Sequence, residues 1–365
     1  MSLPIVAGHR GFKSKYVENT IQGFHECYKT GATIIETDLW LSQDEVLVVS
    51  HDMNTKRIFC DEQGNSTDYN ILQTSYKDVL QKLRVIGSDE HLMNFRQLLN
   101  WFVDYVENEE IGNPKKIMLD LKPVNPTRIL KFIIEDLLYV KNDIKWWYNR
   151  IQFGLWKLNF IKYFNQEKYF QTKFGESNDQ GMKQFDIINI SFSWKYSMVF
   201  LNYNQYLDEL PDKSSYKIKT TGISLIYLAT WSVDFISNFL PIIKFKNLKF
   251  YSWTINFKRQ FDYFVKICHF AKLNEYGVIS DVPDEMEKLK SNPIEFDEKH
   301  SLIESIELSW FQKLAYFFFC RIFDRAINVN PEDFESIVDE YQTVVIKPNP
   351  VARWFFVKLQ HLGIL

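Results

Sequence analysis

Residues 4–52 decide the fold that we expect for this chain, and they read PIVAGHRGFKSKYVENTIQGFHECYKTGATIIETDLWLSQDEVLVVSHD. The stretch holds three short apolar runs that are bounded by glycine or polar residues, at positions 5–7, 33–40 and 45–49. Runs of this length with such boundaries are typical of buried strands. The sequence therefore predicts strands that lie inside a core and end in polar loops.

Ionisable residues stand inside or directly after these runs, at His9, Glu36, Asp38 and His51. Glu36 and Asp38 are two positions apart, so on a strand both side chains face the same way. Burying such groups costs free energy, and a chain selected only for packing would carry Val or Leu instead. The pattern predicts a functional site built at strand ends.

Five short clusters in this stretch share the order and spacing of a known family: His9-Arg10-Gly11, Glu18-Asn19-Thr20, Gly31-Ala32, Glu36-Thr37-Asp38 and His51-Asp52. Together they resemble the glycerophosphodiester phosphodiesterase family, whereas a single His-Arg-Gly would be a weak signal. The resemblance implies an α/β barrel enzyme, a phosphoric diester hydrolase that needs a metal ion.

The rest of the chain alternates between strand and helix patterns. Apolar runs begin near residues 5, 34, 117, 151, 186, 223, 249 and 277, with helical patterns between them. Such alternation predicts a parallel sheet, and eight units predict a closed (β/α)8 TIM barrel. We expect the barrel to occupy residues 1–292 and a C-terminal extension to occupy residues 293–365.

Three acidic residues, Glu36, Asp38 and Asp120, are expected to converge at the barrel mouth. Carboxylates held close together repel one another unless a cation joins them, and an all-oxygen set suits Mg²⁺ or Ca²⁺. The alternative is a salt-bridge network with Arg10 and Lys122. The resemblance favours one divalent cation, although the family usually has Glu where this chain has Asp120, which bears on the choice of metal.

The resemblance assigns the acid–base chemistry to His9 and His51, since histidine can exchange protons near neutral pH. Arg10 and Lys122 would bind the phosphate, as cations do in phosphoryl chemistry. For Arg10 the alternative is a structural ion pair. Trp253 resembles a substrate-pocket wall of the family, and a core tryptophan is the alternative.

The remaining features bound the class of protein. The net charge of −3 does not suggest nucleic-acid binding. The four cysteines have no paired spacing and are expected to be reduced thiols. The first strand begins without a signal-like segment, so we expect an intracellular protein. Asp281 is interpreted as a structural cap for the helix that begins at Pro283.

The C-terminal extension is rich in aromatic residues and predicts contact with a membrane. Residues 309–323 read SWFQKLAYFFFCRIF, too short and too charged to span a bilayer but suited to its interface. The apolar side of this helix is expected to hold Phe311, Leu314, Ala315, Phe318, Phe319 and Ile322, opposite Lys313, Arg321 and Asp324. Residues 351–365 are similarly apolar, and residues 329–342 are expected to be an acidic spacer. The alternative is that both apolar segments pack back on the barrel.

Four further features are Met118-Leu119-Asp120-Leu121-Lys122, Lys141-Asn142-Asp143, Gly154-Leu155-Trp156 and the apolar C-terminal tail. Within the family, they resemble the fungal enzymes that cleave phosphatidylglycerol to diacylglycerol and glycerol 3-phosphate. That resemblance implies a phospholipid substrate and peripheral or monotopic association with an endoplasmic reticulum, lipid droplet or mitochondrial membrane, with no protein partner implied. Two alternatives are a soluble enzyme that releases glycerol 3-phosphate from deacylated phospholipids and a barrel without catalysis that binds lipid surfaces.

Overall fold

The computed structural model of the chain describes residues 2–108, 114–174, 184–211, 217–292, 310–323 and 332–343, and the single residues 350, 354 and 358. Of the apolar stretch at 351–365, almost all lies outside the described residues. So do the side chains of Phe311 and Ile322 and the whole of Asp324, and their predicted places are therefore not assessed.

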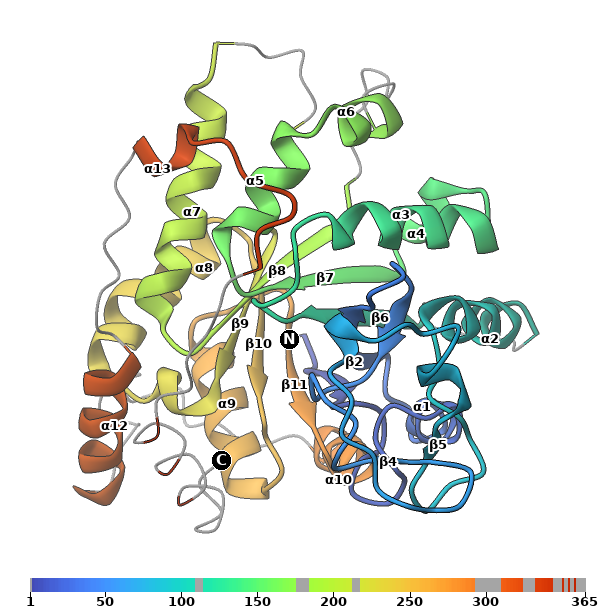
Figure 1. The fold of residues 1–365 in the computed structure, drawn as a ribbon. Coiled ribbons are helices and arrows are strands. Elements are labelled where there is room, and N and C mark those ends of the chain that lie inside the picture. The colour runs from blue at the N-terminus through green and yellow to red at the C-terminus, as the bar shows by residue number, and fades with distance from the viewer. Residues whose placement is uncertain are drawn as a thin grey trace.

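Eight parallel strands form a closed barrel in the described part of the chain (Figure 1), which confirms the predicted (β/α)8 fold. They are β1 (Ile5–Gly8), β2 (Ile34–Leu41), β6 (Lys116–Leu121), β7 (Ile151–Leu155), β8 (Asp186–Ser191), β9 (Gly222–Ile226), β10 (Lys249–Trp253) and β11 (Tyr276–Ser280). The barrel closes because β1 pairs with both β11 and β2. All the carboxyl ends therefore meet at one mouth.

Helices cover the outside of the barrel. They are α1 (Ile21–Lys29), α2 (Phe95–Asn108), α3 (Ile129–Val140), α4 (Ile144–Tyr148), α5 (Leu158–Gln166), α6 (Lys168–Phe174), α7 (Trp194–Glu209), α8 (Leu240–Phe245), α9 (Lys258–Phe270) and α10 (Pro283–Ser291). Helix α1 shows why such segments are helical: the Gly23 amide donates to the Thr20 side chain at 3.1 Å, and Phe24, Cys27 and Tyr28 lie on one buried face.

A small lobe stands beside the mouth between β2 and α2. Strand β3 (Leu47–Val49) runs antiparallel to β2, and β4 (Phe59–Cys60) pairs with β5 (Arg84–Val85). The short helices η1 (Ile71–Gln73) and η2 (Leu80–Lys82) complete the lobe. Its own core is separate from that of the barrel and includes Trp40, Phe59, Ile71, Leu80 and Val85. Residues 53–90, whose sequence is polar, thus form a packed lobe beside the barrel.

The segment at residues 332–343, here named the C-terminal strap, is fastened to the barrel. It begins with helix α13 (Glu332–Glu335). The Glu340 carboxylate accepts hydrogen bonds from Lys131 Nζ at 2.9 Å and from the Tyr163 hydroxyl at 2.6 Å. The expectation of a free acidic spacer here is wrong, because charged and aromatic side chains of α3 and α5 bind this segment.

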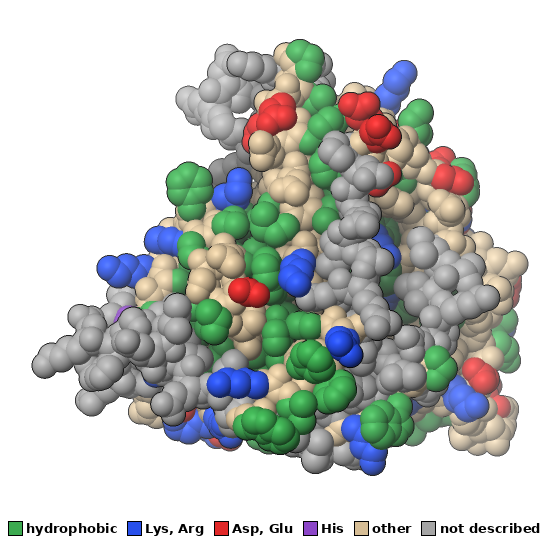
Figure 2. All heavy atoms as spheres, turned by 90° about the vertical axis from the view of Figure 1, so that its left-hand side faces the viewer, with side chains coloured by type: hydrophobic (Ala, Val, Ile, Leu, Met, Phe, Trp, Pro, Cys, Tyr) green, Lys and Arg blue, Asp and Glu red, His purple; other side chains and the backbone are tan. Residues whose placement is uncertain are grey.

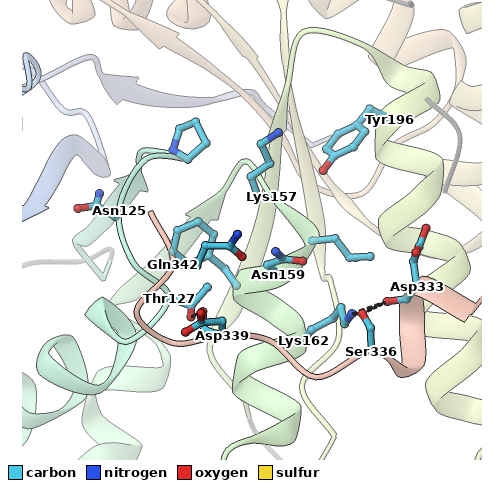
Figure 3. Close-up of a pocket in the computed structure, with 13 residues that line it drawn as sticks. Asn125, Thr127, Lys157, Asn159, Lys162, Tyr196, Asp333, Ser336, Asp339 and Gln342 are labelled. Carbon is cyan, nitrogen blue, oxygen red and sulfur yellow. Dashed lines mark hydrogen bonds between the residues drawn. The ribbon is translucent and has the colours of Figure 1, made fainter. Parts of the chain in front are cut away.

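Figure 3 shows the other attachment of the strap. Lys162 of α5 donates to the backbone oxygen of Asp333 and to Ser336 Oγ, the latter at 2.6 Å. Phe334 is buried, with its ring 5.5 Å from that of Tyr203 on α7. A cavity of about 290 Å³ lies between the strap and the loops that follow β6 and β7. The strap therefore belongs to the folded body.

Helix α12 (Trp310–Phe323) also packs against the barrel. Ala315 and Phe319 are buried in the main core, although they were expected to face lipid. None of the helices in the described ranges has the length and apolarity that crossing a bilayer requires.

Candidate active site

The structure brings the predicted site residues together at the carboxyl ends of the strands. His9 follows β1, His51 follows β3 and Lys122 follows β6. Four further side chains come from within strands: Glu36, Asp38, Asp120 and Trp253. Arg10 stands next to His9. All of them except Asp38 line a pocket of about 900 Å³, and Asp38 is fully buried beside it.

The acidic triad comes from two neighbouring strands. Asp38 of β2 pairs in register with Asp120 of β6, and Glu36 lies two positions earlier on the same face of β2. One ligand oxygen from each carboxylate lies within 4.8 Å of the other two. All three residues were predicted from the sequence, and the parallel register places Asp120 beside Asp38.

The electrostatics of the triad suit a divalent cation. Burial and the charges of Asp38 and Asp120 raise the pKa of Glu36 well above its usual value, and burial likewise raises the pKa of Asp120. For Asp38, burial opposes ionisation, but Lys122 and Arg10 hold its pKa below the usual range. Three oxygen donors at this spacing could hold a divalent cation, whose charge would favour the ionised forms of Glu36 and Asp120.

Lys122 and Arg10 also make the ion pairs that the alternative prediction named. Lys122 Nζ lies 2.7 Å from Asp38 Oδ1 and 2.6 Å from Asp120 Oδ2. Arg10 Nε lies 3.7 Å from Asp38 Oδ2. The salt-bridge network and the cation site therefore share two carboxylates, those of Asp38 and Asp120, and both basic side chains line the pocket.

The backbone conformation of the loop after β1 sets the position of Arg10. Arg10 adopts a left-handed φ of 53°, and Gly11 follows with a φ of 89°. A side chain at Gly11 would also meet the backbone of Gly23 at 3.0 Å, so glycine is required there. This turn lets the Arg10 amide donate to Glu36 Oε2 at 2.9 Å. The His-Arg-Gly motif thus fixes both the arginine and one acid of the triad.

His9 is held by Asp281, which follows β11. His9 Nδ1 lies 2.7 Å from Asp281 Oδ1, and Asn256 Nδ2 donates to the other carboxylate oxygen at 2.9 Å. Burial, followed by the charge of Arg10, lowers the pKa of His9 to about 4. The interpretation of Asp281 as a helix cap is wrong, since α10 begins after Val282 without a side-chain cap. Neutral His9 with Nδ1 engaged leaves Nε2 available as a proton acceptor.

His51 is held by a longer chain of charges. Its Nδ1 lies 2.8 Å from Asp52 Oδ1, and Arg57 Nε donates to Asp52 Oδ2 at 2.6 Å. Arg57 also binds Glu18 through both of its terminal nitrogens, at 2.9 and 2.7 Å, and Arg10 reaches Glu18 at 3.1 Å. Glu18, which the sequence analysis placed in a family-like cluster without a role, thus connects the surroundings of both histidines.

The pocket also has an aromatic wall made of Trp156, Phe192 and Trp253. Their ring centroids are 5.0 to 5.7 Å apart. Trp156 Nε1 also donates to Asp120 Oδ1 at 2.6 Å. This bond fixes the aspartate that replaces the longer glutamate of the family pattern. The predicted pocket tryptophan, Trp253, therefore lies in a three-ring surface, and the other two rings were not predicted.

The sequence analysis missed the roles of four supporting residues of the site: Asp52, Arg57, Trp156 and Asn256. Two of them had a local signal, since Asp52 adjoins a predicted catalytic histidine and Trp156 directly follows the strand at 151–155. Arg57 and Asn256 reach the site through loops whose paths the sequence pattern does not specify.

This fold and site define a class: a (β/α)8 barrel with an oxygen-only cation site and two carboxylate-held histidines at its mouth. Residues 9–285 match the glycerophosphoryl diester phosphodiesterase family, and the chain belongs to that family. This places it among the phosphoric diester hydrolases, and the family typically depends on a divalent metal.

Individual relatives are similar to this chain over different lengths. The chain is 43% identical over 49 residues to human lysophospholipase D GDPD1, which is 13% of this chain and 16% of the relative. It is 30% identical over 106 residues to mouse lysophospholipase D GDPD3, covering 27% and 31%. The chain thus spans less than a third of these curated relatives. An Oleispira antarctica phosphodiesterase solved with its product sn-glycerol-3-phosphate shares the fold, with a TM-score of 0.52, 15% identity, and coverage of 79% and 97%.

Replacing Arg57 with glutamine tests the charge chain behind His51. We expect kcat for a glycerophosphodiester to fall about 10- to 100-fold with little change in KM, since supporting groups around a reactive side chain contribute on this scale. Arg57→Lys should restore part of the rate, and Lys56→Gln, an exposed neighbour, should have no effect. An unchanged kcat and pH–rate profile in Arg57→Gln would show that Arg57 does not position His51.

Proposed function

We propose that this protein is a phospholipase C-type phosphodiesterase that hydrolyses phosphatidylglycerol to diacylglycerol and glycerol 3-phosphate at a membrane surface. The observation that carries the proposal is the mixed lining of the pocket, which combines histidines and charged groups with three adjoining aromatic rings. A glycerophosphate headgroup matches the histidines and charged groups, and the apolar part of a lipid matches the aromatic rings.

The acid–base roles follow from the partners of the two histidines. Neutral His9, with Nδ1 on Asp281, accepts the proton of the headgroup 2-hydroxyl through Nε2, and the hydroxyl oxygen attacks phosphorus. His51, whose Nδ1 lies on the Asp52 carboxylate, donates a proton to the diacylglycerol oxygen as the bond from that oxygen to phosphorus breaks. Water then opens the cyclic phosphate, with the two histidines exchanging roles.

Fixed positive charge stabilises the phosphate during both steps. Arg10 and Lys122 lie beside the triad, and ion pairs hold their positive charges in place at the pocket. The side chains therefore do not have to move when charge develops on the phosphate. A Mg²⁺ or Ca²⁺ ion on Glu36, Asp38 and Asp120 would add Lewis-acid stabilisation of the phosphoryl oxygens. The chain's own cations thus orient the diester and oppose the charge that develops on it.

The location we propose is an intracellular membrane, such as that of the endoplasmic reticulum, lipid droplets or mitochondria, with peripheral or monotopic attachment. The aromatic content of the C-terminal extension supports this, since Trp and Phe with flanking basic residues suit the bilayer interface.

The alternative is a soluble glycerophosphodiester phosphodiesterase that releases glycerol 3-phosphate from deacylated phospholipids. The packing of Phe319 and Phe334 on the barrel favours it, because part of the extension serves the fold. The same packing limits one test: deleting residues 296–365 would remove the C-terminal strap as well as the apolar tail. The two functions are better separated in the full-length chain.

We expect the full-length chain to release diacylglycerol from phosphatidylglycerol vesicles and to leave phosphatidylethanolamine vesicles unchanged, since ethanolamine carries no hydroxyl for the attack on phosphorus. Diacylglycerol and glycerol 3-phosphate would be quantified in parallel with turnover of soluble glycerophosphoglycerol. Equal turnover of phosphatidylethanolamine would contradict the cyclic mechanism. Turnover of the soluble diester alone would assign the alternative function.

A further inference from the structure

Helix α12 is seated beside the mouth of the barrel. It packs on η3 (Tyr227–Thr230), the short helix that directly follows β9. Ala315 and Phe319 face the core, and the Tyr316 phenol lies beside Ser232 in the next loop. The carboxyl end of β9 belongs to the mouth, so α12 lies at the catalytic end of the barrel.

The outer side of α12 carries aromatic and basic residues together. Trp310 is 75% exposed, Phe317 50% and Phe318 48%. Lys313 and Arg321 are exposed too, and the Arg321 guanidinium lies 4.8 Å from the centre of the Phe317 ring. Residues 310–323 contain no acidic residue. The predicted separation of an apolar side from a basic side is therefore replaced by a mixed outer face.

Exposed apolar residues of the barrel loops lie at the same end. Val233 follows η3 and Phe257 follows β10, and both side chains are exposed. Figure 2 faces this side of the molecule and shows hydrophobic side chains gathered with Lys and Arg in its lower part, where Figure 1 places α12. Such a concentration of exposed apolar side chains near a pocket marks an interaction surface.

We propose that Trp310, Phe317, Phe318, Lys313 and Arg321, together with Val233 and Phe257, form a docking face for an anionic phospholipid bilayer. Aromatic side chains enter the headgroup boundary, and Lys and Arg beside them are attracted to anionic lipid. The face turns the mouth toward the bilayer, so a lipid headgroup reaches the triad while its apolar part meets Trp253. This inference rests on the proposed function, because an anionic lipid substrate supplies the anionic surface.

The test measures vesicle binding in the full-length chain with His9→Gln, so that lipid is not consumed. Sedimentation with vesicles of phosphatidylglycerol and phosphatidylcholine is compared with sedimentation with phosphatidylcholine alone. We expect Phe317→Ser/Phe318→Ser to lower binding to the anionic vesicles about tenfold. Lys313→Glu/Arg321→Glu should lower it at least about 30-fold, since two basic residues near such a surface contribute about 2 kcal/mol together.

Phe245→Ser is the matched control, because Phe245 is 88% exposed but precedes β10 at the opposite end of the barrel. With His9 restored, each variant should turn over soluble glycerophosphoglycerol at the unmodified rate, which shows that the fold is intact. Binding within twofold of the unmodified chain in both double variants would overturn the docking face. So would a shift from dimer to monomer without a loss of vesicle binding, which would assign the face to a second copy.

The outcomes separate the docking face from the proposed reaction. If the unmodified chain binds anionic vesicles through these residues but releases no diacylglycerol, the proposed function fails and the docking face stands. If it cleaves phosphatidylglycerol while the double variants bind as well as it does, the docking face fails and the proposed function stands.

Discussion

Turnover of a glycerophosphodiester is expected to fall roughly 10³-fold when His9 is replaced by glutamine, within the range that general acid–base groups contribute. Glutamine keeps a donor for Asp281, so the loss reports the missing proton acceptor and not a broken contact. The pKa of His9 is lowered to about 4 by burial and by Arg10. The base is therefore neutral above about pH 4, and the acidic limb of the rate profile should lie below the usual histidine value of about 6.5.

The same shift has a consequence for stability. The unfolded chain binds a proton to His9 near pH 6.5, while the folded chain does so only near pH 4, so the free energy of unfolding falls as pH drops through this window. His9→Gln should remove this component of the pH dependence, measured by denaturant unfolding at several pH values. His25→Gln, which changes an accessible histidine on α1, is the control. A rate within threefold of the unmodified enzyme in His9→Gln would exclude His9 as the base.

Removal of the divalent cation, or replacement of Glu36 by glutamine, is expected to lower turnover by more than about 100-fold, as losing preorganised charge at a phosphoryl centre does. Burial and the charges of Asp38 and Asp120 favour a proton on Glu36 when no cation is bound. Adding Mg²⁺ or Ca²⁺ should therefore release protons and raise the Tm, because a ligand that binds only the folded state stabilises it.

Calorimetry in two buffers of different ionisation enthalpy measures the protons released, and thermal unfolding measures the stabilisation without relying on activity. Glu26→Gln, at an accessible glutamate of α1, should leave both unchanged. If Mg²⁺ and Ca²⁺ change neither the Tm nor the proton balance of the unmodified chain, the triad is a salt-bridge network with Arg10 and Lys122. Asp120→Glu, which restores the residue usual in the family, should keep binding but change the preference between the two ions.

The sequence alone determined the barrel and the centre of its site. A strand has a period of two, so Glu36 and Asp38 had to share a face, and their place in a buried run excluded an ordinary surface role. The alternation of eight strands with helices required a closed parallel barrel, which brings all carboxyl ends to one mouth. These conclusions depend on patterns within a few residues, or on repetition along the chain.

Only the tertiary structure decided which groups support the two histidines and which side of α12 faces outward. Asp281 lies 272 positions from His9, and Arg57 lies 39 positions from Glu18, so these pairs depend on the paths of loops. An amphipathic pattern shows that a helix has an apolar side, but its neighbours decide whether that side is buried. Phe319 is buried and Phe317 is exposed because η3 and the adjoining loops cover one side of α12. Contacts between distant segments arise from the packing of the whole chain, and local sequence does not encode them.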